Sequence, residues 1–139
     1  MDKKFEILIK VISRVMMSNI DNSVTVEAIK SRKRDDILVE ARQIFCYIAF
    51  IILIPKEPVI AAYLKLNKST VYYSVRIVEG LINVDRKFAQ RFSIIENEFK
   101  RELSENSLTM RIKKIAYKLD ITNFEQVKIE LLELAKEIE

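Results

Sequence analysis

Residues 58–83 read PVIAAYLKLNKSTVYYSVRIVEGLIN. Pro58 suits the start of a short helix, because its ring holds the backbone angle φ near the helical value. Asn67 is a favourable N-cap for a second helix that begins at Lys68 or Ser69 and runs to about residue 83. Two short helices joined by three or four residues, the second of them amphipathic, are the outline of a helix-turn-helix.

The second of these helices has one apolar and one polar face. At about 100° per residue, four aliphatic side chains fall within about 60° of one another: Val71, Val75, Val78 and Ile82. Ser69, Tyr73 and Arg76 point to the opposite side. A hydroxyl, a phenol and a guanidinium can contact phosphates and base edges, although an ordinary solvated face has the same composition.

The remainder of the chain also has helical patterns. One Gly and two Pro among 139 residues leave few turn formers, which disfavours β-hairpins. Apolar spacing and helix-start signals predict helices at about residues 3–19, after Thr25, at about 35–53 and at 85–103. We therefore expect an all-α protein, a helical bundle that contains the helix-turn-helix and continues into a C-terminal helical extension.

We assign residues 1–83 to the helix-turn-helix domain and residues 84–139 to the extension. Three apolar stripes mark the extension: Phe88, Phe92, Ile95 and Phe99, then Leu108, Ile112, Ile115 and Leu119, then Phe124, Val127, Leu131, Leu134 and Ile138. Thr122 and Glu125 form a predicted capping box for the last helix. Such stripes are typical of packing within a bundle, and also of a surface for a dimer or a partner protein.

Composition excludes several classes of site. The chain has no His, so triads that use histidine and metal sites built on imidazole are excluded. Gly80 is the single glycine, and neither a Walker loop nor a dinucleotide fingerprint forms with one. Cys46 has no partner for an internal disulfide, which fits a reducing cytoplasm. We expect no enzymatic activity, no catalytic residue, no metal and no cofactor.

The run IFCYIAFIILI (residues 44–54) is the most apolar part of the chain. Its eleven residues are fewer than the roughly 20 that a membrane-spanning helix needs. We expect it to be a helix buried on all sides at the centre of the bundle, and we expect no membrane partner.

Positive charge is concentrated in the first part of the sequence. Residues 1–78 hold 13 Lys and Arg against 8 Asp and Glu, whereas residues 79–139 hold 11 against 12. This asymmetry predicts that a polyanionic partner is bound by the first part.

Two stretches in that part carry a resemblance to a known family. They are VTVEAIKSRKRDDILVEARQIFCYIAF (residues 24–50) and IAAYLKLNKSTVYYSVRIVEGLI (residues 60–82). They resemble the C-terminal DNA-binding domain of the bacterial replication initiator DnaA, in which a VTVEDI helix, a basic stretch and a helix with ARQIAMYL precede a signature around RDHSTVLHA. The resemblance covers about residues 5–82 and does not include the ATPase domain of that family. It implies an all-helical fold that binds double-stranded DNA at short asymmetric boxes.

By position, the resemblance also implies roles for single residues. The minor-groove arginine of the family falls on Arg34, and the arginine that reaches DNA from the long helix falls on Arg42. The paired hydroxyls of the signature fall on Ser69 and Thr70, at the helix start where phosphate contacts are made. With their neighbours, the predicted DNA-binding residues are Arg34, Arg42, Lys65, Asn67, Lys68, Ser69, Thr70, Tyr73 and Arg76.

The sequence departs from the family pattern at the signature. Leu66, Asn67 and Lys68 stand where the family has Arg, Asp and His, and Phe50 and Ile77 stand where it has lysines. Each lost bidentate base contact removes about 1–3 kcal/mol of discrimination. We therefore expect DNA binding with an altered or relaxed sequence preference.

Two hypotheses follow. The first is a stand-alone duplex-DNA-binding protein, a replication or transcription regulator in the cytoplasm that associates with the nucleoid. The alternative is a helical protein–protein interaction module that has lost specific DNA binding. Its C-terminal helices would pair in a homodimer or with an initiator protein.

Overall fold

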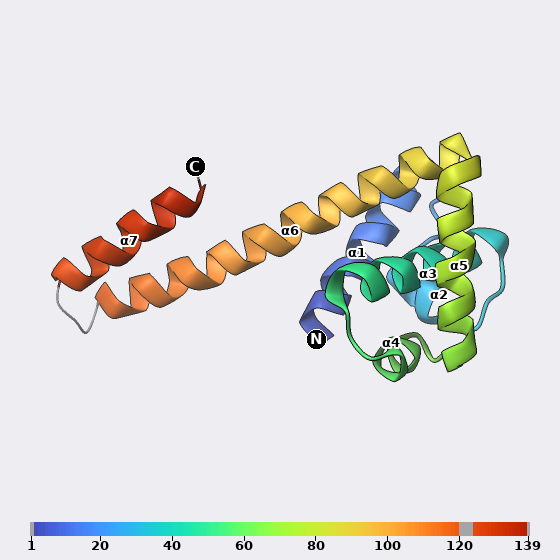
Figure 1. The fold of residues 1–139 in the computed structure, drawn as a ribbon, viewed down its shortest axis with the longest axis horizontal. Coiled ribbons are helices and arrows are strands. Elements are labelled where there is room, and N and C mark those ends of the chain that lie inside the picture. The colour runs from blue at the N-terminus through green and yellow to red at the C-terminus, as the bar shows by residue number, and fades with distance from the viewer. Residues whose placement is uncertain (1, 120–123, 139) are drawn as a thin grey trace. The chain divides into compact units, whose positions relative to one another are not determined.

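The computed structural model describes residues 2–119 and 124–138, and every regular element among them is a helix (Figure 1). The elements are α1 (Asp2–Asn19), α2 (Val26–Lys30), α3 (Asp36–Ile48), the π-helix η1 (Ala49–Leu53), α4 (Glu57–Leu64), α5 (Lys68–Val84), α6 (Arg86–Leu119) and α7 (Phe124–Ile138). The all-α prediction is confirmed. The chain divides into two compact units, unit 1 (Met1–Arg101) and unit 2 (Glu102–Glu139).

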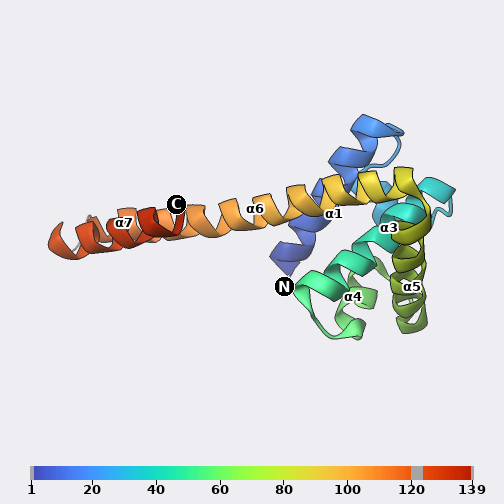
Figure 2. The ribbon, with the colours of Figure 1, turned by 45° about the horizontal axis from the view of Figure 1, so that its top comes forward.

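Helix α3 lies at the centre of unit 1. It packs against α1, α2, η1 and α5, and α4 packs against α5 and η1 (Figure 2). Phe5 of α1, Phe45 of α3 and Tyr63 of α4 form a ring cluster with centroids 5.2–5.5 Å apart. This cluster ties the first helix to the α4–α5 pair, so the core holds both ends of the predicted helix-turn-helix domain together.

The first part of α6 belongs to unit 1. The side chains of its first apolar stripe are all buried: Phe88, Phe92, Ile95 and Phe99. Phe92 contacts Tyr47 of α3 edge to face, with ring centroids 5.3 Å apart. Arg91 pairs with Glu40 of α3 at 2.6 Å. Residues 84–101, which the sequence analysis placed in the extension, thus complete the core of unit 1.

The apolar run ends differently from the prediction. Residues 44–49 are buried except for the half-buried Tyr47. The chain then widens into η1, where the Ile54 N–H donates to the Ala49 carbonyl at 3.1 Å. Ile51 is 45% exposed and Ile54 is 76% exposed with a left-handed φ of 51°, so burial on all sides is wrong for this end. Pro55 follows and cannot continue the helix. Among the described residues no helix is both long and apolar enough to cross a membrane.

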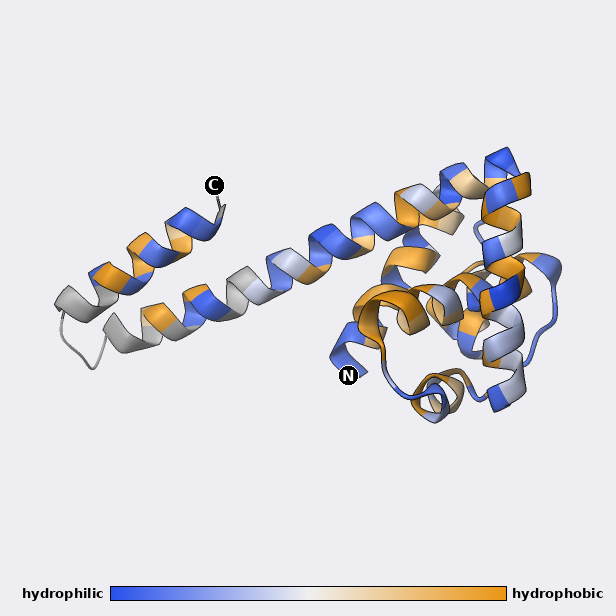
Figure 3. Ribbon diagram, in the orientation of Figure 1, coloured by the Kyte–Doolittle hydropathy of each residue, from blue (hydrophilic) through white to orange (hydrophobic). Residues whose placement is uncertain are grey.

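Unit 2 consists of the C-terminal part of α6 together with α7. Ile115 of α6 and Leu134 of α7 are buried together, and Arg111 forms an ion pair with Glu137. The earlier α6 residue, Arg111, pairs with the later α7 residue, Glu137, whereas the later α6 residue, Ile115, lies with the earlier α7 residue, Leu134. The two segments therefore run antiparallel. Apolar and polar residues alternate along the coloured part of α7 (Figure 3). The capping box expected at Thr122 and Glu125 lies outside the residues whose side chains the structure describes.

Candidate functional site

A three-residue turn joins α4 to α5. Lys65 adopts the left-handed conformation, with φ of 56°, and the Leu66 N–H donates to the Ala61 carbonyl at 2.8 Å. The Lys65 N–H donates to the Ala62 carbonyl at 3.3 Å. These two hydrogen bonds form a Schellman motif at the end of α4. The chain therefore reverses without a glycine, and α5 starts at Lys68, one of the two starts that the sequence predicted.

Asn67 occupies the N-cap position of α5, as predicted, but it acts through its backbone. Its carbonyl accepts from the Thr70 N–H at 3.0 Å, whereas its side chain makes no capping hydrogen bond. The amide side chain of Asn67 is exposed. The Asn67 side chain therefore does not cap the helix and is available to a ligand.

The two predicted faces of α5 are present. Val71, Val75 and Val78 are buried, and Ile82 is half-buried. The polar side chains on the opposite face are exposed: Ser69, Tyr73 and Arg76. Between the two faces, the buried Ser74 hydroxyl donates to the Thr70 carbonyl at 2.8 Å.

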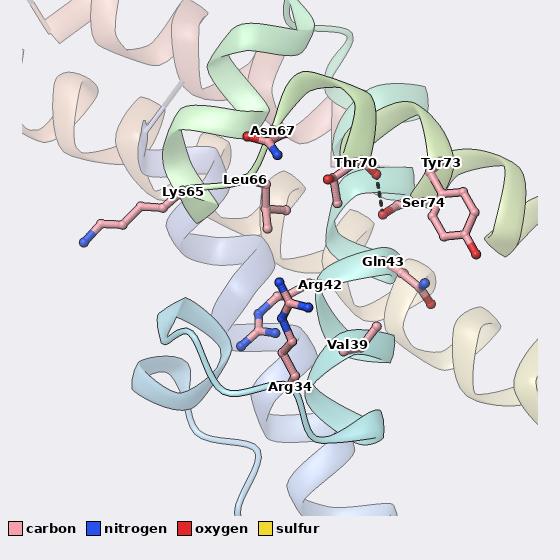
Figure 4. A pocket seen from close by; sticks show the side chains of 10 residues that line it. All are labelled: Arg34, Val39, Arg42, Gln43, Lys65, Leu66, Asn67, Thr70, Tyr73 and Ser74. Atoms are coloured by element: carbon pink, nitrogen blue, oxygen red, sulfur yellow. Dashed lines mark hydrogen bonds between the residues drawn. The ribbon is translucent and has the colours of Figure 1, made fainter.

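A cavity of about 420 Å³ lies between the N-terminal part of α5, the α4–α5 turn, α3 and the segment before α3 (Figure 4). It is lined by Arg34, Val39, Arg42, Gln43, Lys65, Leu66, Asn67, Thr70, Tyr73 and Ser74. We call it the basic pocket, because three of these residues are cations and none is a carboxylate. Six of the nine predicted DNA-binding residues line it.

Arg42 has a structural role that the sequence did not indicate. Its side chain is 8% exposed, and its Nε donates to the Ile29 carbonyl at 2.7 Å. Its Nη2 donates to the carbonyls of Ser31 at 2.8 Å and Ala28 at 3.2 Å. These carbonyls lie at the end of α2, where backbone acceptors lack helical partners. Two of the three guanidinium nitrogens of Arg42, Nε and Nη2, thus donate hydrogen bonds within the protein. Among the described residues, Nη1 has no hydrogen-bond acceptor.

The electrostatics around Arg42 favour an anion. Burial lowers the pKa of Arg42, and the positive charge of Arg34 lowers it further, whereas the charge of Asp35 opposes both. The side chains of Arg34 and Arg42 lie beside each other at the pocket (Figure 4). An arginine stays charged at neutral pH, so the two guanidiniums repel each other, and a bound anion would relieve that repulsion.

Three predicted residues do not line the basic pocket. Lys68, Ser69 and Arg76 are exposed on α5. Sequence reasoning in turn missed four lining residues: Val39, Gln43, Leu66 and Ser74. Helical spacing places Val39 next to Gln43 and Thr70 next to Ser74, but it does not show that α3 and α5 bring these pairs to one cavity.

Groups for other chemistry are few in the described part of the chain. No cluster of three or more His, Cys, Asp or Glu is present there that could hold a metal ion. Burial raises the pKa of the Cys46 thiol to about 12, so this thiol is protonated and unreactive at neutral pH.

No protein family, curated protein or solved structure matches this chain.

Proposed function

We propose that the protein binds double-stranded DNA through unit 1, as a DNA-binding module of the replication-initiator type. On this proposal, α4, the turn and α5 act as a helix-turn-helix, and the basic pocket receives the DNA backbone. The observation that carries the proposal is the pocket itself, which combines Arg34, Arg42 and Lys65 with no carboxylate in its lining.

The surroundings of the pocket favour a polyanion over a small anion. Lys68, Ser69 and Arg76 extend the polar surface along the exposed face of α5. At 1.5 Å per residue, the stretch from Lys68 to Arg76 extends about 12 Å along α5, which is close to the roughly 12 Å width of the DNA major groove. On this proposal its side chains would contact a polyanion outside the pocket, whereas a single phosphate would need the pocket alone.

The contacts divide into those that position the protein and those that read bases. Arg34, Lys65 and Lys68 suit phosphates or a narrow minor groove. Tyr73 and Arg76 are exposed, and on this proposal they would contact base edges. Leu66 lines the pocket where the resembled family has an arginine, so one cation of the family pattern has no counterpart here. This supports binding with a relaxed sequence preference, in the role of a replication or transcription regulator.

The experiment is fluorescence anisotropy of the full chain with two labelled duplexes, one with the DNA box of the DnaA family and one scrambled, over a salt series. Neutralising about five phosphates gives a slope of log K against log salt near −4 to −5. We expect this steep slope for both duplexes, with at most a modest preference for the box. Absence of binding at low salt, or binding that does not respond to salt, would overturn the proposal.

A further inference from the structure

Arg42 holds one guanidinium nitrogen in a fixed position for a ligand. Its side chain is buried, and hydrogen bonds of 2.7–3.2 Å from Nε and Nη2 to the carbonyls of Ala28, Ile29 and Ser31 fix its orientation. Nη1 has no acceptor among the described residues. It also keeps contact with solvent, because Nε of Arg91 is the one fully buried side-chain nitrogen or oxygen without a partner in that part of the chain. Since Arg42 lines the basic pocket, Nη1 is the donor that it offers to a ligand there.

Arg34 supplies a second guanidinium beside the first. Both side chains line the pocket, and they lie beside each other in Figure 4. Arg34 is exposed, so its guanidinium is able to turn towards a ligand, whereas that of Arg42 is held. The charge of Asp35 also acts on Arg42, but Asp35 does not line the pocket. Two guanidiniums that meet without a carboxylate between them are suited to the oxygens of a phosphate group.

The charge of the lining favours a phosphate monoester over a phosphodiester. Three cations line the pocket, Arg34, Arg42 and Lys65, and no carboxylate does. A phosphate monoester carries a charge of about −1.5 to −2 at neutral pH and has three strong acceptor oxygens. Each phosphodiester of a DNA backbone carries a single negative charge. The monoester therefore gains more electrostatic energy from the same cations.

The basic pocket has room for more than a phosphate group. Its volume of about 420 Å³ falls in the range of roughly 300–1,000 Å³ that is typical of small-molecule sites. Val39 and Leu66 provide apolar surface in its lining, and the amides of Gln43 and Asn67 provide uncharged polar groups. Such a mixture suits an organic group joined to the phosphate. The pocket thus fits a monoester of about the size of a mononucleotide.

We propose that the basic pocket binds a free phosphate monoester of about mononucleotide size, with the phosphate group between Nη1 of Arg42 and the guanidinium of Arg34. The ester and a DNA backbone cannot fill the pocket together, so the ester competes with DNA and thereby regulates DNA binding. The competition rests on the proposed function, whereas binding of the ester does not. On that function DNA also contacts α5 outside the pocket, which keeps DNA the tighter ligand overall.

The test titrates the full chain, without DNA and at constant ionic strength, with adenosine monophosphate, its cyclic phosphodiester and adenosine. The readout is the NMR resonance of the Arg42 Nε–H group, which is held in its hydrogen bond to the Ile29 carbonyl. We expect a saturable shift with adenosine monophosphate at a dissociation constant of about 1 mM or lower. The cyclic diester should bind about tenfold more weakly, because it carries one negative charge, and adenosine should not saturate.

Two variants locate the bound ester. Arg34→Ala should weaken the binding of adenosine monophosphate by about tenfold. The matched control is Lys87→Ala, which should weaken it by less than about twofold, because Lys87 is an exposed cation near the start of α6 that does not line the pocket. Equal losses in the two variants would overturn the proposed site. So would equal binding of the monoester and the cyclic diester, or a wild type that adenosine monophosphate does not saturate.

A second titration adds a labelled duplex and separates this inference from the proposed function. At ten times its dissociation constant, adenosine monophosphate should weaken the apparent DNA affinity by about tenfold through mass action. An ester that saturates the pocket without weakening DNA binding would overturn the competition. A protein that binds the ester and no DNA would overturn both the competition and the proposed function, and the monoester site would stand. A protein that binds DNA and not the ester would overturn the monoester site alone.

Discussion

The Nε atom of Arg42 donates a 2.7 Å hydrogen bond to the carbonyl oxygen of Ile29, thirteen residues earlier in the chain. This bond and the two from Nη2 fasten the end of α2 to α3. The basic residues of 32–34 follow directly. Arg42 therefore acts as a positioning residue, which holds the segment that carries Arg34 beside the basic pocket.

Arg42→Ala should destabilise the protein. The substitution leaves the carbonyls of Ala28, Ile29 and Ser31 without their charged donor, and we expect the free energy of unfolding to fall by about 2–3 kcal/mol. Urea denaturation followed by circular dichroism measures the change. Arg34→Ala is the matched control, because Arg34 is exposed and its loss should alter stability by no more than about 0.5 kcal/mol. Similar small losses of stability in both variants would show that Arg42 does not fasten the end of α2 to α3.

Lys65→Gly should separate stability from binding. Lys65 has a left-handed φ of 56°, a conformation that glycine adopts without steric penalty. We expect the free energy of unfolding to rise by about 0.5–1 kcal/mol, while DNA affinity falls with the lost cation. Lys65→Ala removes the same charge and keeps the Cβ, so it should weaken DNA binding without the gain in stability. A loss of stability in the glycine variant would contradict the conformation of the turn.

Phe92→Ala tests whether the first part of α6 completes the core of unit 1. Phe92 is 7% exposed and contacts the Tyr47 ring, so its truncation should lower the free energy of unfolding by about 3 kcal/mol. Ile94→Ala is the control on the same helix, because Ile94 is 45% exposed and should lose less than about 1 kcal/mol. Equal effects in chemical denaturation would show that α6 does not pack on α3.

The thiol of Cys46 gives a pH dependence. Burial raises its pKa from 9.0 to about 12 in the folded protein. Above pH 9 the unfolded chain releases this proton and the folded chain retains it, so this contribution is fully present below pH 9 and is lost as the pH rises towards 12. The stability advantage of the wild type over Cys46→Ala should therefore shrink above pH 9. A constant difference in urea denaturation across that range would mean that the thiol is not buried.

Local signals in the sequence predicted most helices of unit 1. Thr25 caps α2 through its Oγ1 at 3.1 Å from the Ala28 nitrogen, and α5 begins after Asn67 as expected. Helix α4 begins at Glu57, one residue before the start predicted at Pro58, so Pro58 is the second residue of the helix. These features depend on neighbouring residues, which a single sequence displays directly.

Features that depend on distant contacts were not predictable. Periodicity shows that Phe92 faces a partner, but not that the partner is Tyr47. An arginine on a long helix has the same pattern whether it meets DNA or, as Arg42 does, the carbonyls of a preceding helix. Likewise, the left-handed Ile54 and the π-helix before it arise where an apolar run meets Pro55, and apolar content alone does not reveal that end.

The most direct test of the central claim compares DNA binding by the wild type, Arg34→Ala and Lys87→Ala in fluorescence anisotropy at one low salt concentration. Both variants lose one positive charge from unit 1, but Arg34 lines the basic pocket and Lys87 is exposed near the start of α6, beyond the far end of α5. We predict that Arg34→Ala weakens binding by about tenfold and Lys87→Ala by less than about twofold. Equal losses in the two variants, or a wild type that does not bind duplex DNA, would contradict binding through the pocket.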